Sequence, residues 1–180
     1  MNDKIHKALG IFLDAMRPFV VSFLQQHFRN EPWEGLFFAR LKPAKQATWN
    51  QAMKAQGENQ SCMYFIDYNN LTDFAIGFKR ELGTEFGNPD KANKFISYLQ
   101  ELKDIRNKCN HYQALDNEEI EGKSNLSMMA LSLANLLEIE GDDEAASNYS
   151  AIALNCPNEK ILECVNEFRE RLSKKIRSKM

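Results

Sequence analysis

The chain contains 180 residues, of which 43% are hydrophobic and 27% are charged. This length and composition predict one folded domain with its own core, and they exclude a disordered chain. The net charge is −2 and the pI is near 6.0, which excludes a protein whose overall field attracts nucleic acid. Any RNA contact must therefore be local, or shared across a dimer.

The cysteine pattern and the N-terminal segment bear on metal binding and location. No Cys-x-x-Cys pair occurs and no cysteine stands at zinc-ligand spacing from a histidine, so the sequence predicts neither a metal nor a cofactor. The N-terminal segment is interrupted by Asp14 and the pair Arg17-Pro18, and no apolar run approaches the ~18–20 residues that span a bilayer. We therefore expect a cytoplasmic protein with reduced thiols and no membrane contact. The cysteines are Cys62, Cys109, Cys156 and Cys164.

The first third of the chain shows helical periodicity. Apolar residues recur every three or four positions from Ile5 to Phe28, which predicts either one helix kinked at Pro18 or two helices meeting near Met16. Residues 30–44 contain two prolines and a glycine, which indicate a connector with at most a short helix. A short helix from Lys45 to Ala55 and a loop at 57–61 follow.

The remaining segments are also predicted to be helical. Residues 62–85 predict one long helix, and the GNPD sequence at 87–90 predicts its end and the start of a helix over about 90–109. Asp116 and Glu119 form a capping-box signal for a helix that continues to about residue 141. A last amphipathic helix begins after Pro157 and ends in a basic tail. Because no two-residue alternation persists, the predicted fold class is all-α.

Residues 101–113, ELKDIRNKCNHYQ, hold the strongest candidate site. Arg106, Asn107, Asn110 and His111 bring a guanidinium, two amides and an imidazole within a turn and a half at the end of a long helix. On an ideal helix Arg106 and Asn110 lie about 40° apart, whereas His111 lies about 140° from Arg106. If the helix frays at Asn110, His111 can swing towards the arginine.

These residue types suit RNA cleavage without a metal. The 2′-OH must lose a proton as it attacks the adjacent phosphate, and the leaving 5′-oxygen must gain one. An imidazole that titrates near neutrality performs either transfer. A planar guanidinium is well shaped to stabilise the charge that develops on the phosphorane oxygens. The same spacing also fits a structural role, in which His111 caps the helix and Arg106 pairs with Asp104, Glu101 or another carboxylate.

The RNKCNH string at 106–111 resembles the motif of HEPN domains, in which an arginine is followed after four to six residues by a histidine. Asn107 matches the polar residue that usually follows the arginine. The string is similar to the RNKWAH form of one defence-associated branch, with Cys109 and Asn110 replacing tryptophan and alanine. Residues 8–28, 67–82 and 114–141 also look like helices of that branch, so the resemblance covers about 8–150.

The resemblance implies an up-and-down helical bundle over residues 1–150. Residues 151–180 lie outside the resemblance, and we expect their amphipathic helix to pack on the same domain or to extend it. The resemblance also implies a homodimer in which two Arg/His motifs face each other, and a metal-independent endoribonuclease of toxin–antitoxin or anti-phage type. Arg106, Asn107 and His111 would then be catalytic, and Asn110 and Lys108 would contact the RNA substrate. An antitoxin or another defence protein is the further partner expected in such systems.

Two other interpretations remain open from the sequence. The chain could be a non-catalytic HEPN module that binds RNA, a nucleotide or a protein within a larger defence system. It could also be an antitoxin-like or purely structural bundle in which the motif is coincidental. Among other residues, we expect His27 to be a core or interface histidine and Trp33 and Trp49 to pack in the interior. Arg17 and Arg29 either line a cleft near the motif or are surface charges.

Overall fold

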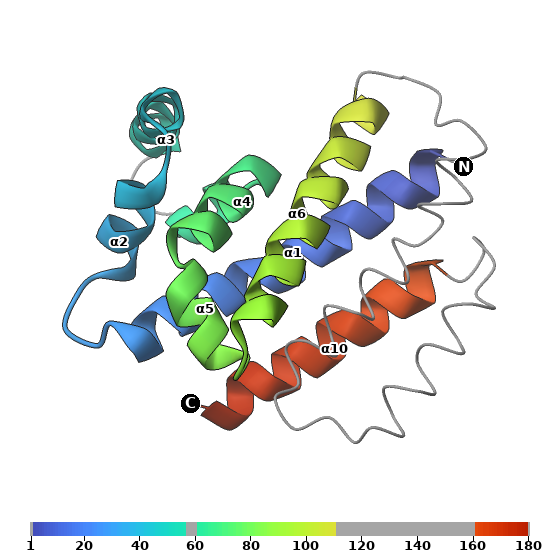
Figure 1. Cartoon of the computed structure of the whole chain (residues 1–180). Coiled ribbons are helices and arrows are strands. Elements are labelled where there is room, and N and C mark those ends of the chain that lie inside the picture. The colour runs from blue at the N-terminus through green and yellow to red at the C-terminus, as the bar shows by residue number, and fades with distance from the viewer. Residues whose placement is uncertain (1, 57–60, 111–160, 180) are drawn as a thin grey trace.

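The structure is a computed structural model that describes residues 2–56, 61–110 and 161–179, and all structural statements below concern these ranges. Within them the chain forms seven α-helices, one 3-10 turn and no strand, which confirms the predicted all-α class. The helices pack as a bundle around the first helix, α1 (Figure 1). The predicted capping box at Asp116 and Glu119 and the helix that follows it lie outside the described residues.

Helix α1 runs unbroken from Asn2 to His27, with Pro18 inside it. Of the two alternatives that the sequence left open, a single helix containing Pro18 is observed, and two helices meeting near Met16 are not. Proline removes one backbone donor from the ladder, but the remaining hydrogen bonds and the packing of one apolar face hold this 26-residue helix together. Its buried side chains include Leu9, Phe12 and Met16, each no more than 2% exposed.

Part of α1 is also apolar enough to cross a membrane by length and composition alone. The stretch His6–His27 has a mean hydropathy of 1.3, so the expectation that no segment approaches this limit is wrong. Half of this window is buried inside the fold (50%), and the core helix of a protein outside the membrane passes the same test.

Helices α2 (Trp33–Arg40) and α3 (Pro43–Gln56) follow, as the sequence predicts for the connector and the short helix. Both tryptophans are interior residues, as expected. Trp33 is 7% exposed and packs on Phe37, and Trp49 is 6% exposed with its ring 5.4 Å from the ring of Phe37. Phe37 in turn stacks on Phe74 at 6.1 Å, which joins these two helices to the core.

The single helix predicted over residues 62–85 is wrong, because this segment divides into three elements. They are a 3-10 turn, η2 (Cys62–Phe65), and helices α4 (Tyr68–Gly77) and α5 (Lys79–Glu85). The first break has a long-range cause. Arg17 of α1 donates to the carbonyls of Tyr64 and Ile66 at 3.1 and 3.0 Å, and Asp67 then starts α4 by accepting from the backbone N–H of Asn70 at 2.8 Å.

Helix α6 (Pro89–Asn110) starts and ends within a residue of the predicted positions. Gly87 adopts a positive φ of 69°, a conformation that favours glycine, and the Asn88 side chain accepts from the N–H of Asp90 at 2.8 Å. Near its start, Phe95 packs on Phe19 of α1 at 6.4 Å. Near its end, α6 approaches the first turns of α1, so the two helices run in opposite directions (Figure 1).

The C-terminal helix, α10 (Ile161–Lys179), packs along α1 (Figure 1). Phe168 is fully buried, and its ring stacks on that of Phe12 with centroids 5.0 Å apart. Val165 and Leu172, 0% and 3% exposed, extend this buried face by one turn on either side. The last turns of both helices meet at Glu85, so α10 and α1 run in the same direction.

Glu85, at the end of α5, connects three helices. Its carboxylate lies 3.2 Å from His27 Nε2 and also accepts from the ammonium group of Lys179, and its side chain is only 12% exposed. Burial raises the pKa of Glu85, but the hydrogen bond and charge of Lys179, the bond from His27 and the charge of Lys175 outweigh it. The net pKa of this carboxyl is lower than usual. His27, which we expected to be a core or interface histidine, is half-buried at the contact of these helices, with its side chain 23% exposed.

A lowered pKa makes the folded state sensitive to acid. Because the folded-state pKa of Glu85 lies below its unfolded value of about 4.3, its stabilising effect is complete above that value and is lost as the pH falls through the folded-state pKa. We therefore expect the free energy of unfolding of Glu85→Gln to decline less steeply than that of the native protein between about pH 5 and 3. Urea titrations at several pH values measure this slope. Glu81→Gln on the same helix is the control, and equal slopes for Glu85→Gln and the native protein would contradict the assignment.

Candidate functional site

The predicted site lies at the C-terminal end of α6. Leu102 and Ile105, which are 1% and 4% exposed, fix one face of this last turn in the core. Arg106, Asn107 and Lys108 follow as half-buried residues on the remaining surface. This is the arrangement that the apolar periodicity of the segment predicts.

The rest of the motif is only partly described. Cys109 and Asn110 belong to the last turn of α6, but their side chains lie outside the description. His111 lies outside the described residues altogether. The swing of His111 towards Arg106 and the substrate contact of Asn110 therefore stay predictions.

Arg106 and Asn107 are brought together directly. Arg106 Nη1 donates to Asn107 Oδ1 at 3.2 Å, so neighbouring residues on the helix combine a cation and an amide in one group. In the described part of the chain Arg106 forms no ion pair, so the alternative pairing with Asp104 or Glu101 is not observed. The hydrogen bond fixes the direction of a guanidinium that has further N–H donors available for an anion.

The charge of this guanidinium acts on a buried hydroxyl. Tyr68, 3% exposed at the start of α4, donates its hydroxyl to the carbonyl of Leu9 at 2.7 Å. Burial raises the pKa of Tyr68 well above its ordinary value, while the charges of Arg106 and Arg17 act to lower it. Both arginines are thus near one buried hydroxyl, where α1, α4 and α6 meet.

Arg17 has a structural role in this cluster. Besides its two bonds to the carbonyls of Tyr64 and Ile66, its Nη1 donates to Asp14 Oδ1 at 2.6 Å. These three hydrogen bonds hold the guanidinium in place. The two to the carbonyls of Tyr64 and Ile66 explain why η2 ends there. Arg17 is thus bound within the fold, which is neither of the two roles that the sequence left open, whereas Arg29 is an exposed residue after α1.

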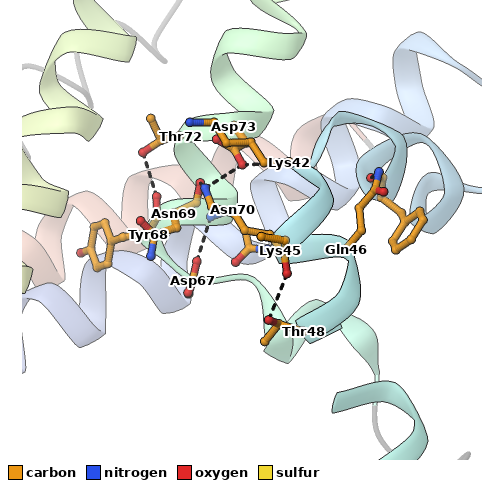
Figure 2. Close-up of polar contacts among 12 residues, drawn as sticks. Lys42, Lys45, Gln46, Thr48, Asp67, Tyr68, Asn69, Asn70, Thr72 and Asp73 are labelled. Carbon is orange, nitrogen blue, oxygen red and sulfur yellow. Dashed lines mark hydrogen bonds and ion pairs between the residues drawn. The ribbon is translucent and has the colours of Figure 1, made fainter. Parts of the chain in front are cut away.

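The sequence did not indicate a second polar cluster, between α3 and α4 (Figure 2). Lys45 Nζ donates to Asp73 Oδ2 at 2.7 Å and to the carbonyl of Asn69 at 3.2 Å. Asp73 is only 7% exposed, so its charge requires this partner. The pair spans 28 positions, and no local pattern marks either residue. Only the docking of α3 on α4 brings them together.

The histidine, cysteine, aspartate and glutamate side chains of the described ranges do not cluster. Among those residues, no group of three or more histidines, cysteines, aspartates and glutamates is close enough to hold a metal ion. Cys62 is a half-buried free thiol in η2.

Comparison with models of protein families, with curated proteins and with solved structures finds no match to this chain. The resemblance to HEPN domains therefore depends on the RNKCNH string and the segments around it.

Proposed function

We propose that this protein is a metal-independent endoribonuclease of the HEPN kind, acting in a toxin or anti-phage setting. The observation that carries the proposal is the RNKCNH string at the end of α6, where the side chains of Arg106 and Asn107 are hydrogen-bonded at 3.2 Å. An all-α bundle and a half-buried arginine at the end of a long helix support it.

The proposed reaction begins with transfer of the 2′-OH proton to an imidazole. The 2′-oxygen then bonds to the adjacent phosphorus while the bond from phosphorus to the 5′-oxygen breaks. A second imidazole gives a proton to that leaving oxygen. The products are a 2′,3′-cyclic phosphate and a 5′-OH, with no net oxidation or reduction.

The residues have separate roles in this scheme. His111 is the general acid or base, and Arg106 stabilises the charge that develops on the phosphorane oxygens. Asn107 holds the guanidinium through the hydrogen bond between the two side chains. Asn110 and Lys108 contact the phosphates of the RNA substrate.

We further propose that the active enzyme is a homodimer. Two proton transfers are required, and each chain has one histidine in the motif. A net charge of −2 gives a single chain no overall attraction for RNA, whereas two motifs face to face concentrate arginine and lysine in one cleft. The cytoplasm, where such an enzyme meets RNA, is the location we propose.

RNA cleavage in excess EDTA tests this proposal. The purified protein is expected to cut single-stranded or structured RNA at an unchanged rate after divalent cations are removed. Heat-denatured protein from the same preparation is the control for contaminating nucleases. Absence of cleavage over a diverse RNA pool, or cleavage that stops in EDTA and returns with Mg²⁺, would contradict it.

A further inference from the structure

A cavity lies between α3, α4 and the 3-10 turn η2, at the polar cluster shown in Figure 2. Its volume is about 280 Å³, just below the ~300 Å³ at which pockets for drug-sized ligands begin. It therefore suits a single small ring system. The lining residues are Lys45, Thr48, Trp49, Ala52, Phe65, Asp67, Asn69 and Asn70.

One wall of the cavity is apolar and aromatic. Trp49 and Phe65 meet edge to face there, with ring centroids 5.9 Å apart. Trp49 is held from behind by Phe37 and is 6% exposed, so this wall is rigid. A rigid aromatic wall favours a flat, weakly hydrated molecule over a flexible or strongly charged one.

The cavity is also lined by a side-chain amide, that of Asn70. Asn70 is only 7% exposed and lines the cavity, and its side chain makes no hydrogen bond to any residue in the described ranges. The amide atoms are not sealed from solvent, so a ligand in the cavity can replace water as both acceptor and donor. The NH₂ donor and the carbonyl acceptor of the amide match the adjacent acceptor and donor groups on the edge of a nucleobase.

The charges around the cavity exclude a phosphate as the main ligand. Lys45 is the one cation among the lining residues, and its ammonium is already 2.7 Å from the buried carboxylate of Asp73. Asp67 adds a second carboxylate to the lining and caps α4 with one of its oxygens. One cation against two carboxylates repels an anion but accommodates a neutral ring with polar edges.

We propose that this cavity binds one unpaired nucleobase, with its ring against Trp49 and Phe65 and its polar edge on the amide of Asn70. The inference does not depend on the ribonuclease proposal, because none of its residues belongs to the RNKCNH motif. The base can come from a free nucleoside or from a single-stranded RNA, since both present the same ring and edge.

Calorimetric titration of the full chain with each of the four ribonucleosides tests the proposal. At least one is expected to bind saturably, at micromolar to low-millimolar concentration. Ala52→Leu places a larger side chain into the cavity, and it is expected to weaken binding by about tenfold or more. Ala55→Leu adds the same side chain to an exposed position of the same helix, and it should leave the dissociation constant unchanged within about twofold.

Asn70→Ser removes the amide without filling the cavity, and it should weaken binding by about five- to tenfold. His111→Ala should bind as the native protein does, which separates this site from the proposed active site. A four-nucleotide RNA that binds more tightly than its nucleoside identifies a strand as the source of the base, and equal affinity identifies the free nucleoside. Absence of saturable binding by all four nucleosides, or equal binding by the Ala52→Leu and Ala55→Leu variants, overturns the proposal.

Discussion

Replacing His111 with alanine is expected to slow RNA cleavage by about 10²–10⁴-fold, because the enzyme then loses its proton-transfer group. The helical content and the unfolding midpoint should stay near those of the native protein. Cleavage rates under single-turnover conditions, measured together with circular dichroism, give both quantities. His6→Ala, at an exposed position of α1, is the matched control and should cleave at the native rate.

Arg106 offers an independent test of the same site. Arg106→Ala removes the guanidinium and should slow cleavage by about 10²–10³-fold, the usual cost of losing one donor to a developing anion. Arg106→Lys keeps the charge but loses the planar fork and the bond to Asn107, so an intermediate rate is expected. Lys103→Ala on the same helix is the control. A folded His111→Ala or Arg106→Ala protein that still cleaves at the native rate in EDTA would rule out the proposed roles.

Replacing Phe168 with alanine is expected to lower the free energy of unfolding by about 3–5 kcal/mol. The side chain is fully buried, and it joins α10 to α1 through its stack on Phe12 at 5.0 Å. Its removal leaves a cavity at the contact between the first and last helices. Urea denaturation followed by circular dichroism measures the loss.

A control and a double-mutant cycle sharpen this prediction. Ile76→Ala truncates a large apolar residue that is 51% exposed, and it should change the free energy of unfolding by no more than about 0.5 kcal/mol. In a cycle of Phe168→Ala with Phe12→Ala, the coupling energy should be about 0.5–1.5 kcal/mol, as for other stacked aromatic pairs. A Phe168→Ala loss below about 1 kcal/mol would mean that α10 does not pack in the core as described.

The apolar periodicity of the sequence was sufficient to predict the helical class and several helix ends. The GNPD sequence indicated the start of α6, where Gly87 has a positive φ and the Asn88 side chain accepts from the N–H of Asp90. Local turn and capping interactions determine such helix ends, so a few adjacent residues are enough to predict them. Leu102 and Ile105, three residues apart on α6, are both buried, as helical spacing of apolar residues requires.

Features set by distant residues could not be predicted in this way. The break before α4 depends on Arg17 of α1, whose guanidinium binds the carbonyls of Tyr64 and Ile66. Pro18 suggested an interruption in α1, but packing along a buried face keeps that helix continuous. The pairing of Lys45 with Asp73 needs α3 docked on α4. In the first two cases tertiary contacts outweigh a local rule, and in the third no local rule applies.

The sequence predicted which residues form the candidate site, but only part of how they are arranged. That Arg106 and Asn107 would stand at the end of a helix followed from the sequence, whereas their mutual hydrogen bond and the nearby Tyr68 hydroxyl did not. The Tyr68 hydroxyl donates to the carbonyl of Leu9, 59 positions away, so its place beside α6 is again a tertiary feature. The cavity lined by the Asn70 amide likewise depends on tertiary structure, so the sequence did not predict it.

The chemistry at the cut RNA end tests the central claim most directly. Mass spectrometry of a short RNA cleaved by the native protein in excess EDTA identifies the group left on the 3′ side of the scission. Attack by the 2′-OH predicts a 2′,3′-cyclic phosphate on one fragment, a 5′-OH on the other, and neither product with His111→Ala. A 3′-OH with a 5′-phosphate would show that water attacks instead, and it would contradict the mechanism assigned to Arg106 and His111.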